Sequence, residues 1–173
     1  MKPYGDDVVN VQAQLRGYGS ACERFGTAAT GEDPVAAYVP LFEALNWAVA
    51  LDDRIKDTWM PDGESLGRKW RERAGHGAEF LAGVRYARNS IHHHWADALR
   101  LDTGGRAYPR RYPLRYFEWL WRDVDEIPTP SSPYGRDVYE SELAGRPAKA
   151  TLMTLREAFR FVSKLLEPPV PHG

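Results

Sequence analysis

The side chains that could do chemistry gather in one short stretch of the chain. This stretch, residues 85–94, contains Arg85, Arg88, Asn89, His92, His93 and His94. Histidine titrates near neutral pH and can transfer a proton, whereas the planar guanidinium of arginine binds a phosphate or a carboxylate. Together these residue types indicate proton transfer beside a bound anion.

The three consecutive histidines, His92 to His94, do not predict a metal site. Side chains of neighbouring residues on a helix point about 100° apart, so they cannot converge on one ion. The chain also has no pair of histidines four residues apart, the spacing that lets one helix chelate a metal. Gly104-Gly105 lacks the lysine and hydroxyl residue of a phosphate-binding loop. We therefore expect neither a metal nor another cofactor.

An amphipathic helix over about residues 77–101 would hold this cluster. Apolar residues recur along it at helical spacing, namely Phe80, Val84, Ala87, Ile91, Trp95 and Ala98. On an ideal helix Arg85, Asn89 and His93 form a polar flank beside this stripe. Asn89 and His93 are four residues apart, so their side chains can touch.

Arg88 falls nearer the apolar stripe than His93 does, and a guanidinium in that position needs a partner. The partner is either a carboxylate of the preceding helix or an anion bound where two protomers meet. The carboxylates that the sequence offers are Glu43, Asp52 and Asp53.

Apolar spacing predicts three further helices, over about residues 6–29, 33–59 and 148–167. Asp33 and Pro34 are a typical cap and first residue, so they mark the start of the second of these helices. The polar stretch 60–73 is interpreted as a connecting loop with room for a short helix.

Residues 106–122 are rich in arginines and aromatic residues and lack helical spacing, which favours a strand, a hairpin or an extended arm. With the proline-rich stretch that follows, they belong to an irregular insertion over about residues 104–135. This composition suits nucleic acid binding, with Arg110 and Arg111 on phosphates and aromatic rings on bases. It equally suits a dimer interface, or a small aromatic core with arginines pointing outward.

These elements predict an all-α, mainly helical protein. We expect one domain, residues 1–173, built as an antiparallel helix bundle that carries the irregular or short-strand insertion.

Charge and composition limit the environment of the protein. The formal net charge is −1, so any contact with nucleic acid must be local. Cys22 is the only cysteine, which excludes an internal disulfide and a four-cysteine metal site. The sequence has neither the pattern of a secretion signal nor a run of about 20 apolar residues. We therefore expect a cytoplasmic protein that does not enter a membrane.

The segment Arg88-Asn89-Ser90-Ile91-His92-His93 resembles the Arg-Asn-x-x-x-His form of the Arg-x(4–6)-His motif of the HEPN superfamily. Many members of that superfamily are metal-independent ribonucleases of toxin–antitoxin and other defence systems. The resemblance implies a helix bundle, loosely over residues 6–101 and 148–167, and a homodimer in which the motifs of two protomers form one composite site.

The resemblance also implies roles for individual residues. His93 would take the proton from a ribose 2′-hydroxyl, which attacks the adjacent phosphate and leaves a 2′,3′-cyclic phosphate. Arg88 would stabilise the charge that develops on the phosphoryl oxygens, and Asn89 would orient His93 or the phosphate. Arg85 with His92, and Arg88 with His94, fit other permitted spacings, so the identity of the active histidine stays open.

The sequence thus predicts a metal-independent endoribonuclease with Arg88, Asn89 and His93 as catalytic residues. The residues expected to bind the substrate are Arg85, His92, Arg110 and Arg111. RNA, a second copy of the chain and an antitoxin or other protein are the partners that this function implies. The alternative is a non-catalytic helical module that binds a protein or a nucleotide, with Arg88 paired to an acid of a neighbouring helix.

Overall fold

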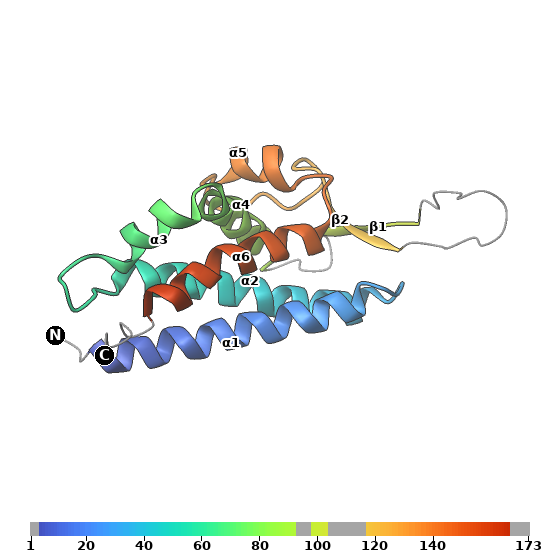
Figure 1. The fold of residues 1–173 in the computed structure, drawn as a ribbon. Helices are drawn as coiled ribbons and strands as arrows, with labels where there is room; N and C mark the ends of the chain where they lie inside the picture. The colour runs from blue at the N-terminus through green and yellow to red at the C-terminus, as the bar shows by residue number, and fades with distance from the viewer. Residues whose placement is uncertain (1–3, 93–97, 104–116, 167–173) are drawn as a thin grey trace, which may run out of the picture.

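The computed structural model describes residues 4–92, 98–103 and 117–166, and within them the protein is mainly helical, as expected (Figure 1). The helices are α1 (Tyr4–Ala28), α2 (Pro34–Asp57), α3 (Leu66–Ala74), α4 (His76–Ile91), α5 (Arg136–Val138), the π-helix η2 (Tyr139–Leu143) and α6 (Ala148–Leu166). A two-stranded antiparallel sheet, β1 (Leu99–Asp102) and β2 (Glu118–Trp121), completes the described part.

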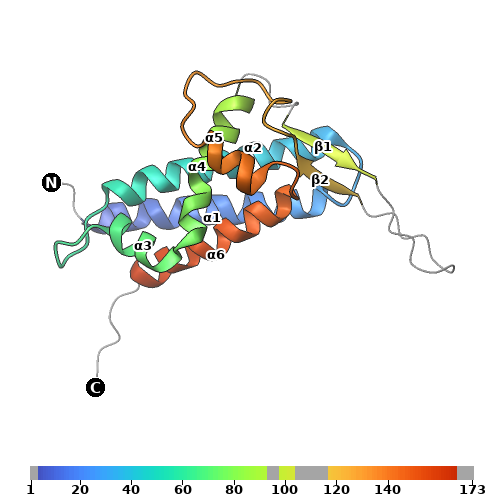
Figure 2. The same cartoon turned by 90° about the horizontal axis from the view of Figure 1, so that it is seen from above.

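The two longest helices, α1 and α2, form an antiparallel pair, and α6 packs against α1 (Figure 1). Seen from above, α4 crosses α2 at a steep angle, and the end of α4 that begins at His76 lies beside α3 (Figure 2). The start of α2 is as predicted: Asp33 accepts hydrogen bonds from the backbone N–H groups of Val35 and Ala36, and Pro34 is the first helical residue.

The predicted apolar stripes form the core. In α4 the buried residues include Phe80, Val84, Ala87 and Ile91. In α6 they include Leu152, Leu155, Phe159, Val162 and Leu166. All of them belong to one hydrophobic cluster that also takes in residues of α1, α2 and the sheet.

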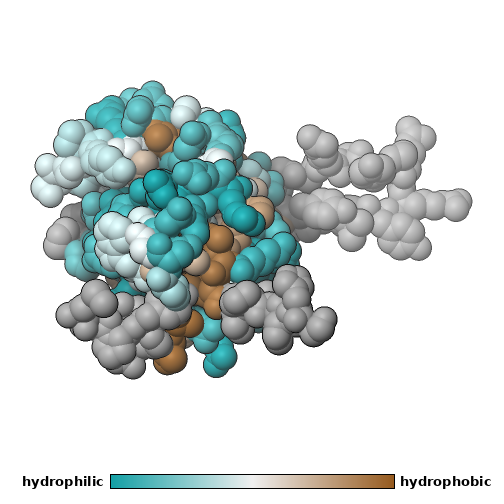
Figure 3. All heavy atoms as spheres, turned by 60° about the vertical axis from the view of Figure 1, so that its left-hand side comes forward, coloured by the Kyte–Doolittle hydropathy of each residue, from teal (hydrophilic) through white to brown (hydrophobic). Residues whose placement is uncertain are grey.

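Within the described residues, α2 is the one helix that is long and apolar enough to cross a membrane. About half of its apolar stretch is buried against the rest of the protein, and Asp52, Asp53, Arg54 and Lys56 follow near its end. The buried half of this stretch belongs to the core. The face of the molecule in Figure 3 is mostly hydrophilic, with hydrophobic residues in a narrow band on its lower half and in a separate spot near the top.

The predicted helix 77–101 is wrong at its C-terminal end. Helix α4 is described to Ile91, residues 93–97 lie outside the described part of the chain, and Leu99 to Asp102 form β1, with Leu99 opposite Trp121 and Leu101 opposite Trp119. Leu99 is also fixed to α2, because the Tyr38 hydroxyl donates to its carbonyl at 3.0 Å and accepts from its N–H at 3.3 Å. Pairing with a distant strand therefore overrides the local helical spacing of this stretch.

Two further segments contain regular structure that the sequence allows for. The stretch 60–73, expected to be a loop with room for a short helix, contains most of α3, and the Ser65 hydroxyl caps this helix by accepting from Arg68 N–H at 3.4 Å. The insertion expected at 104–135 contains the strand β2, and residues 104–116 lie outside the described part of the chain.

The chain after β2 returns to α4, and its backbone packs closely against α4 at Gly135. The backbone of Gly135 has φ +82°, and a Cβ built there would lie 2.0 Å from the carbonyl oxygen of Ala82. Because only glycine fits both the backbone conformation and this approach, Gly135 fixes the position of the segment that precedes α5.

Replacement of Gly135 should therefore be costly. We expect Gly135→Ala to lower the free energy of unfolding by more than about 2 kcal/mol, since left-handed strain and a backbone clash act together. Gly63→Ala is the matched control, because Gly63 has φ +79° and no atom within 4 Å of its added Cβ. Urea unfolding followed by circular dichroism measures both, and an equal loss in the two variants would contradict the close approach.

Candidate functional site

Arg88 and Asn89 lie in the last turn of α4, and His92 follows the helix directly. The Arg88 side chain is half-buried and contacts two amide oxygens. Its Nε donates to Asn46 Oδ1 of α2 at 3.0 Å, and its Nη1 donates to Asn89 Oδ1 at 3.1 Å. Asn46 is held in turn, because its Nδ2 donates to the carbonyl of Phe42 at 2.8 Å.

The carboxylates expected to pair with Arg88 contact other arginines. Asp52 and Asp53 bind Arg85, and Glu43 forms an ion pair with Arg24 of α1. Arg85 lies one turn before Arg88, so it is Arg85 that reaches the charged end of α2. Arg88 reaches the uncharged Asn46 instead, and an amide oxygen orients a guanidinium without cancelling its charge.

A groove of about 440 Å³ opens beside Arg88. Arg88, Asn89, Ser90 and His92 line one side, and the segment Pro128–Ser131 lines the other. His92 is exposed, and its ring stacks on Phe42 with ring centroids 6.2 Å apart. The groove therefore brings together a cation, an amide and an imidazole, which is a set that can bind an oxyanion and exchange protons with it.

Three residues of the predicted site lie outside the described part of the chain: His93, Arg110 and Arg111. The expected contact between Asn89 and His93 therefore stays a prediction. Arg85, expected to bind substrate, faces a different cavity from that of Arg88.

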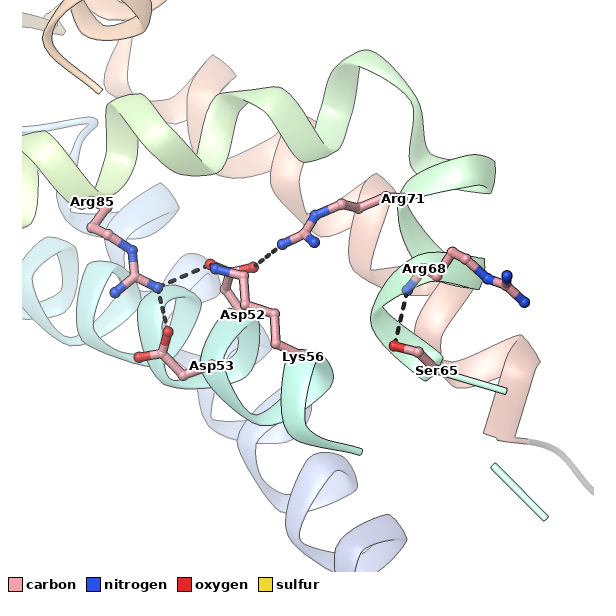
Figure 4. Close-up of polar contacts among 7 residues, drawn as sticks. All are labelled: Asp52, Asp53, Lys56, Ser65, Arg68, Arg71 and Arg85. Carbon is pink, nitrogen blue, oxygen red and sulfur yellow. Dashed lines mark hydrogen bonds and ion pairs between the residues drawn. The ribbon is translucent and has the colours of Figure 1, made fainter. Parts of the chain in front are cut away.

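Arg85 belongs to a cluster of charges around Asp52 (Figure 4). The Asp52 side chain is only 5% exposed. It accepts from Arg85 Nη2 at 2.9 Å and from Arg71 Nη2 at 3.4 Å, and it also forms an ion pair with Lys56. Asp53, at the surface, accepts from the same Nη2 of Arg85 at 2.5 Å. Helices α2, α3 and α4 thus meet at one buried carboxylate.

The two carboxylates determine the ionisation of Arg85. Burial alone would lower the pKa of its guanidinium, but the hydrogen bonds and charges of Asp53 and Asp52 outweigh burial and raise that pKa. Arg85 therefore remains a fixed positive charge between α2 and α4.

Sequence reasoning missed three parts of the site. Asn46 lies seven residues before Asp53, so helical spacing alone puts both on one face of α2. Arg71 was missed because its stretch was interpreted as a loop. The segment 128–131 was expected to be irregular surface chain, and no local pattern indicates that it returns to α4.

Comparison of the chain with models of protein families, with curated proteins and with solved structures finds no match. Among the residues that the structure describes, no three His, Cys, Asp or Glu side chains are close enough to hold a metal ion. The case for a function therefore rests on the residues themselves.

Neighbouring Asp52 and Asp53 should differ sharply in their contribution to stability. We expect Asp52→Asn to lower the free energy of unfolding by about 1.5–3 kcal/mol, because it weakens charged hydrogen bonds at a buried position. Asp53→Asn should cost less than about 1 kcal/mol, since that side chain is 56% exposed. Urea unfolding of the two variants tests this difference, and similar losses would contradict a central role for Asp52.

Proposed function

We propose that this protein is a metal-independent endoribonuclease, acting in the cytoplasm in a toxin–antitoxin or defence setting. In this proposal Arg88 binds the scissile phosphate, Asn89 orients it, and His93 is the general base. The protein acts as a homodimer whose two motifs form one site, and an antitoxin or another protein restrains it.

The observation that carries the proposal is the state of Arg88. Its guanidinium is held by the amide oxygens of Asn46 and Asn89 at 3.0 and 3.1 Å, and it lines an open groove. A guanidinium has five N–H donors, and these contacts use only two of them. Among the residues that the structure describes, no carboxylate pairs with Arg88, and a positioned cation of this kind stabilises the negative charge of a phosphate at little cost in reorganisation.

The reaction needs no group beyond these side chains and a second histidine. His93 takes the proton of the 2′-hydroxyl, and the 2′-oxygen attacks the phosphorus. The bond from phosphorus to the 5′-oxygen breaks, and a histidine of the second protomer supplies the proton for that leaving oxygen. The products are a 2′,3′-cyclic phosphate and a free 5′-hydroxyl.

The remaining predicted residues have supporting roles in this proposal. His92 lines the groove and contacts the RNA beside the phosphate. Arg110 and Arg111 bind phosphates of the flanking strand. Arg85 acts through structure, because its ion pairs with Asp52 and Asp53 hold α4, and hence Arg88, against α2.

The first test is cleavage of RNA by the purified protein in the presence of EDTA. We expect wild type to release fragments that end in a 2′,3′-cyclic phosphate. Arg88→Ala should slow cleavage by about 100-fold or more, and His93→Ala by about 100- to 10,000-fold. Cleavage that neither substitution changes would contradict the proposal. Binding of RNA without any cleavage would favour the non-catalytic module.

A second test changes the charge at Arg88 without replacing it. Asn46→Asp puts a carboxylate against the guanidinium, so we expect it to slow cleavage by about tenfold or more. Asn46→Ala is the matched control, because it loses the same hydrogen bond to Phe42 but adds no charge. Cleavage rates and thermal unfolding are measured for both. Equal rates for the two variants would show that the free charge of Arg88 is not what the reaction uses.

A further inference from the structure

A second cavity, of about 510 Å³, lies nearer the start of α4 than the Arg88 groove does. Asp52 and Lys56 of α2, Arg71 of α3 and Arg85 of α4 line it, and Tyr134 completes its wall. We call it the Tyr134 cavity. It lies where three helices meet at the buried carboxylate of Asp52, so its charged walls come from rigid elements.

The lining of this cavity carries three cations, Lys56, Arg71 and Arg85, and two carboxylates, Asp52 and Glu79. Lys56, Arg71 and Arg85 converge on Asp52, with Arg71 and Arg85 reaching it from either side (Figure 4). Asp53 pairs with Arg85 alone. Asp52 and Asp53 thus lie among three cations, and Glu79, which also lines the cavity, contacts His76 Nδ1 at 2.9 Å.

The cations at the mouth are the ones that a ligand can reach. The side chains of Lys56 and Arg71 are 38% and 49% exposed, whereas that of Asp52 is buried behind them. The contact of Arg71 with Asp52, at 3.4 Å, is also long for a charged hydrogen bond. Lys56 and Arg71 can therefore donate further hydrogen bonds to a phosphate while they keep their contacts with Asp52.

Tyr134 adds an aromatic surface to this anion site. It is 61% exposed, so much of its surface is open to a ligand. Its backbone is nevertheless fixed: its N–H donates to the Ser132 hydroxyl at 3.3 Å, and Gly135 next to it is seated on Ala82 of α4. An exposed ring on a fixed backbone, beside cations, is the arrangement on which proteins stack the bases of single strands.

Two elements line both the Tyr134 cavity and the Arg88 groove. On one side, α4 supplies Arg85 to the cavity and Arg88 to the groove. On the other side, one short segment supplies Tyr134 to the cavity and Pro128–Ser131 to the groove. From Ala78, which also lines the cavity, to Arg88 the helix rises about 15 Å, a span that a strand of a few nucleotides can cover.

We propose that the Tyr134 cavity is a subsite for single-stranded RNA, a few nucleotides away from the phosphate at Arg88. The base of that nucleotide stacks on Tyr134, and its phosphate binds Arg71 and Lys56. This inference rests on the proposed function for the identity of the ligand. It assigns to the enzyme a preference for unpaired RNA, because a base held in a duplex cannot stack on a protein ring.

The test measures binding separately from cleavage. A fluorescent eight-nucleotide strand with 2′-O-methyl groups cannot be cleaved by the 2′-hydroxyl, and its affinity is read by fluorescence anisotropy. We expect Tyr134→Ala to weaken binding by about 5- to 100-fold, the cost of one lost stacking contact, and Tyr134→Phe to keep the affinity. Arg71→Ala should weaken binding and reduce its dependence on log salt by about one unit of slope.

Two exposed residues of α6 serve as controls, Met153→Ala for the ring and Arg160→Ala for the charge. Wild-type affinity in both, with losses in Tyr134→Ala and Arg71→Ala, supports the subsite. Wild-type affinity in Tyr134→Ala and Arg71→Ala as well, or no binding by the wild-type protein, overturns it. If the subsite is overturned but RNA is still cleaved in a reaction that needs Arg88, the endoribonuclease proposal remains and only the subsite proposal fails. If the subsite variants lose affinity but RNA is never cleaved, only the endoribonuclease proposal fails.

Discussion

The buried carboxylate of Asp52 is the constraint on which the arrangement of α2, α3 and α4 depends. A charge removed from water is tolerated only when other charges or donors surround it, and here Arg85, Arg71 and Lys56 do so. Each of these cations comes from a defined helix, so the need to satisfy one carboxylate fixes the relative position of three helices. The placement of Arg88 against Asn46 follows from that fixed contact between α2 and α4.

A single helical turn separates a structural arginine from a candidate functional one. Arg85 meets two carboxylates and contributes to the fold, whereas Arg88, three residues later, meets two amides and keeps its charge beside a groove. The difference arises from α2, which carries Asn46 two turns before Asp53. The chemistry available at the groove is thus decided as much by the partner helix as by the motif itself.

Local sequence predicted the helices well because their signals are local. Asp33 and Pro34 mark the start of α2, and apolar spacing finds the buried faces of α4 and α6. The strand β1 was missed because Leu99 continues a helical spacing, and its partner Trp121 lies far along the chain. The mainly helical class was predictable, whereas the point at which α4 ends was not.

The candidate site could be predicted in part. The residue types of the site and the helix that carries them can be recognised from one segment, Arg88 to His92. The partner of each arginine, however, depends on the register between α2 and α4. Spacing along α4 alone does not give that register. A shift of α2 by one turn would place Glu43 instead of Asn46 beside Arg88. The far wall of the groove, Pro128–Ser131, could not be predicted either, because its position depends on the chain returning to α4 at Gly135.

That far wall is rich in proline, with Pro128, Pro130 and Pro133 in the segment before Gly135. Proline rings restrict the backbone before any ligand arrives, so this wall has little conformational entropy left to lose on binding. An irregular segment would ordinarily have to be ordered by the molecule that it contacts, at the expense of affinity. Here the covalent structure of the chain has done that ordering in advance, so the groove can hold its shape without a regular element on one side.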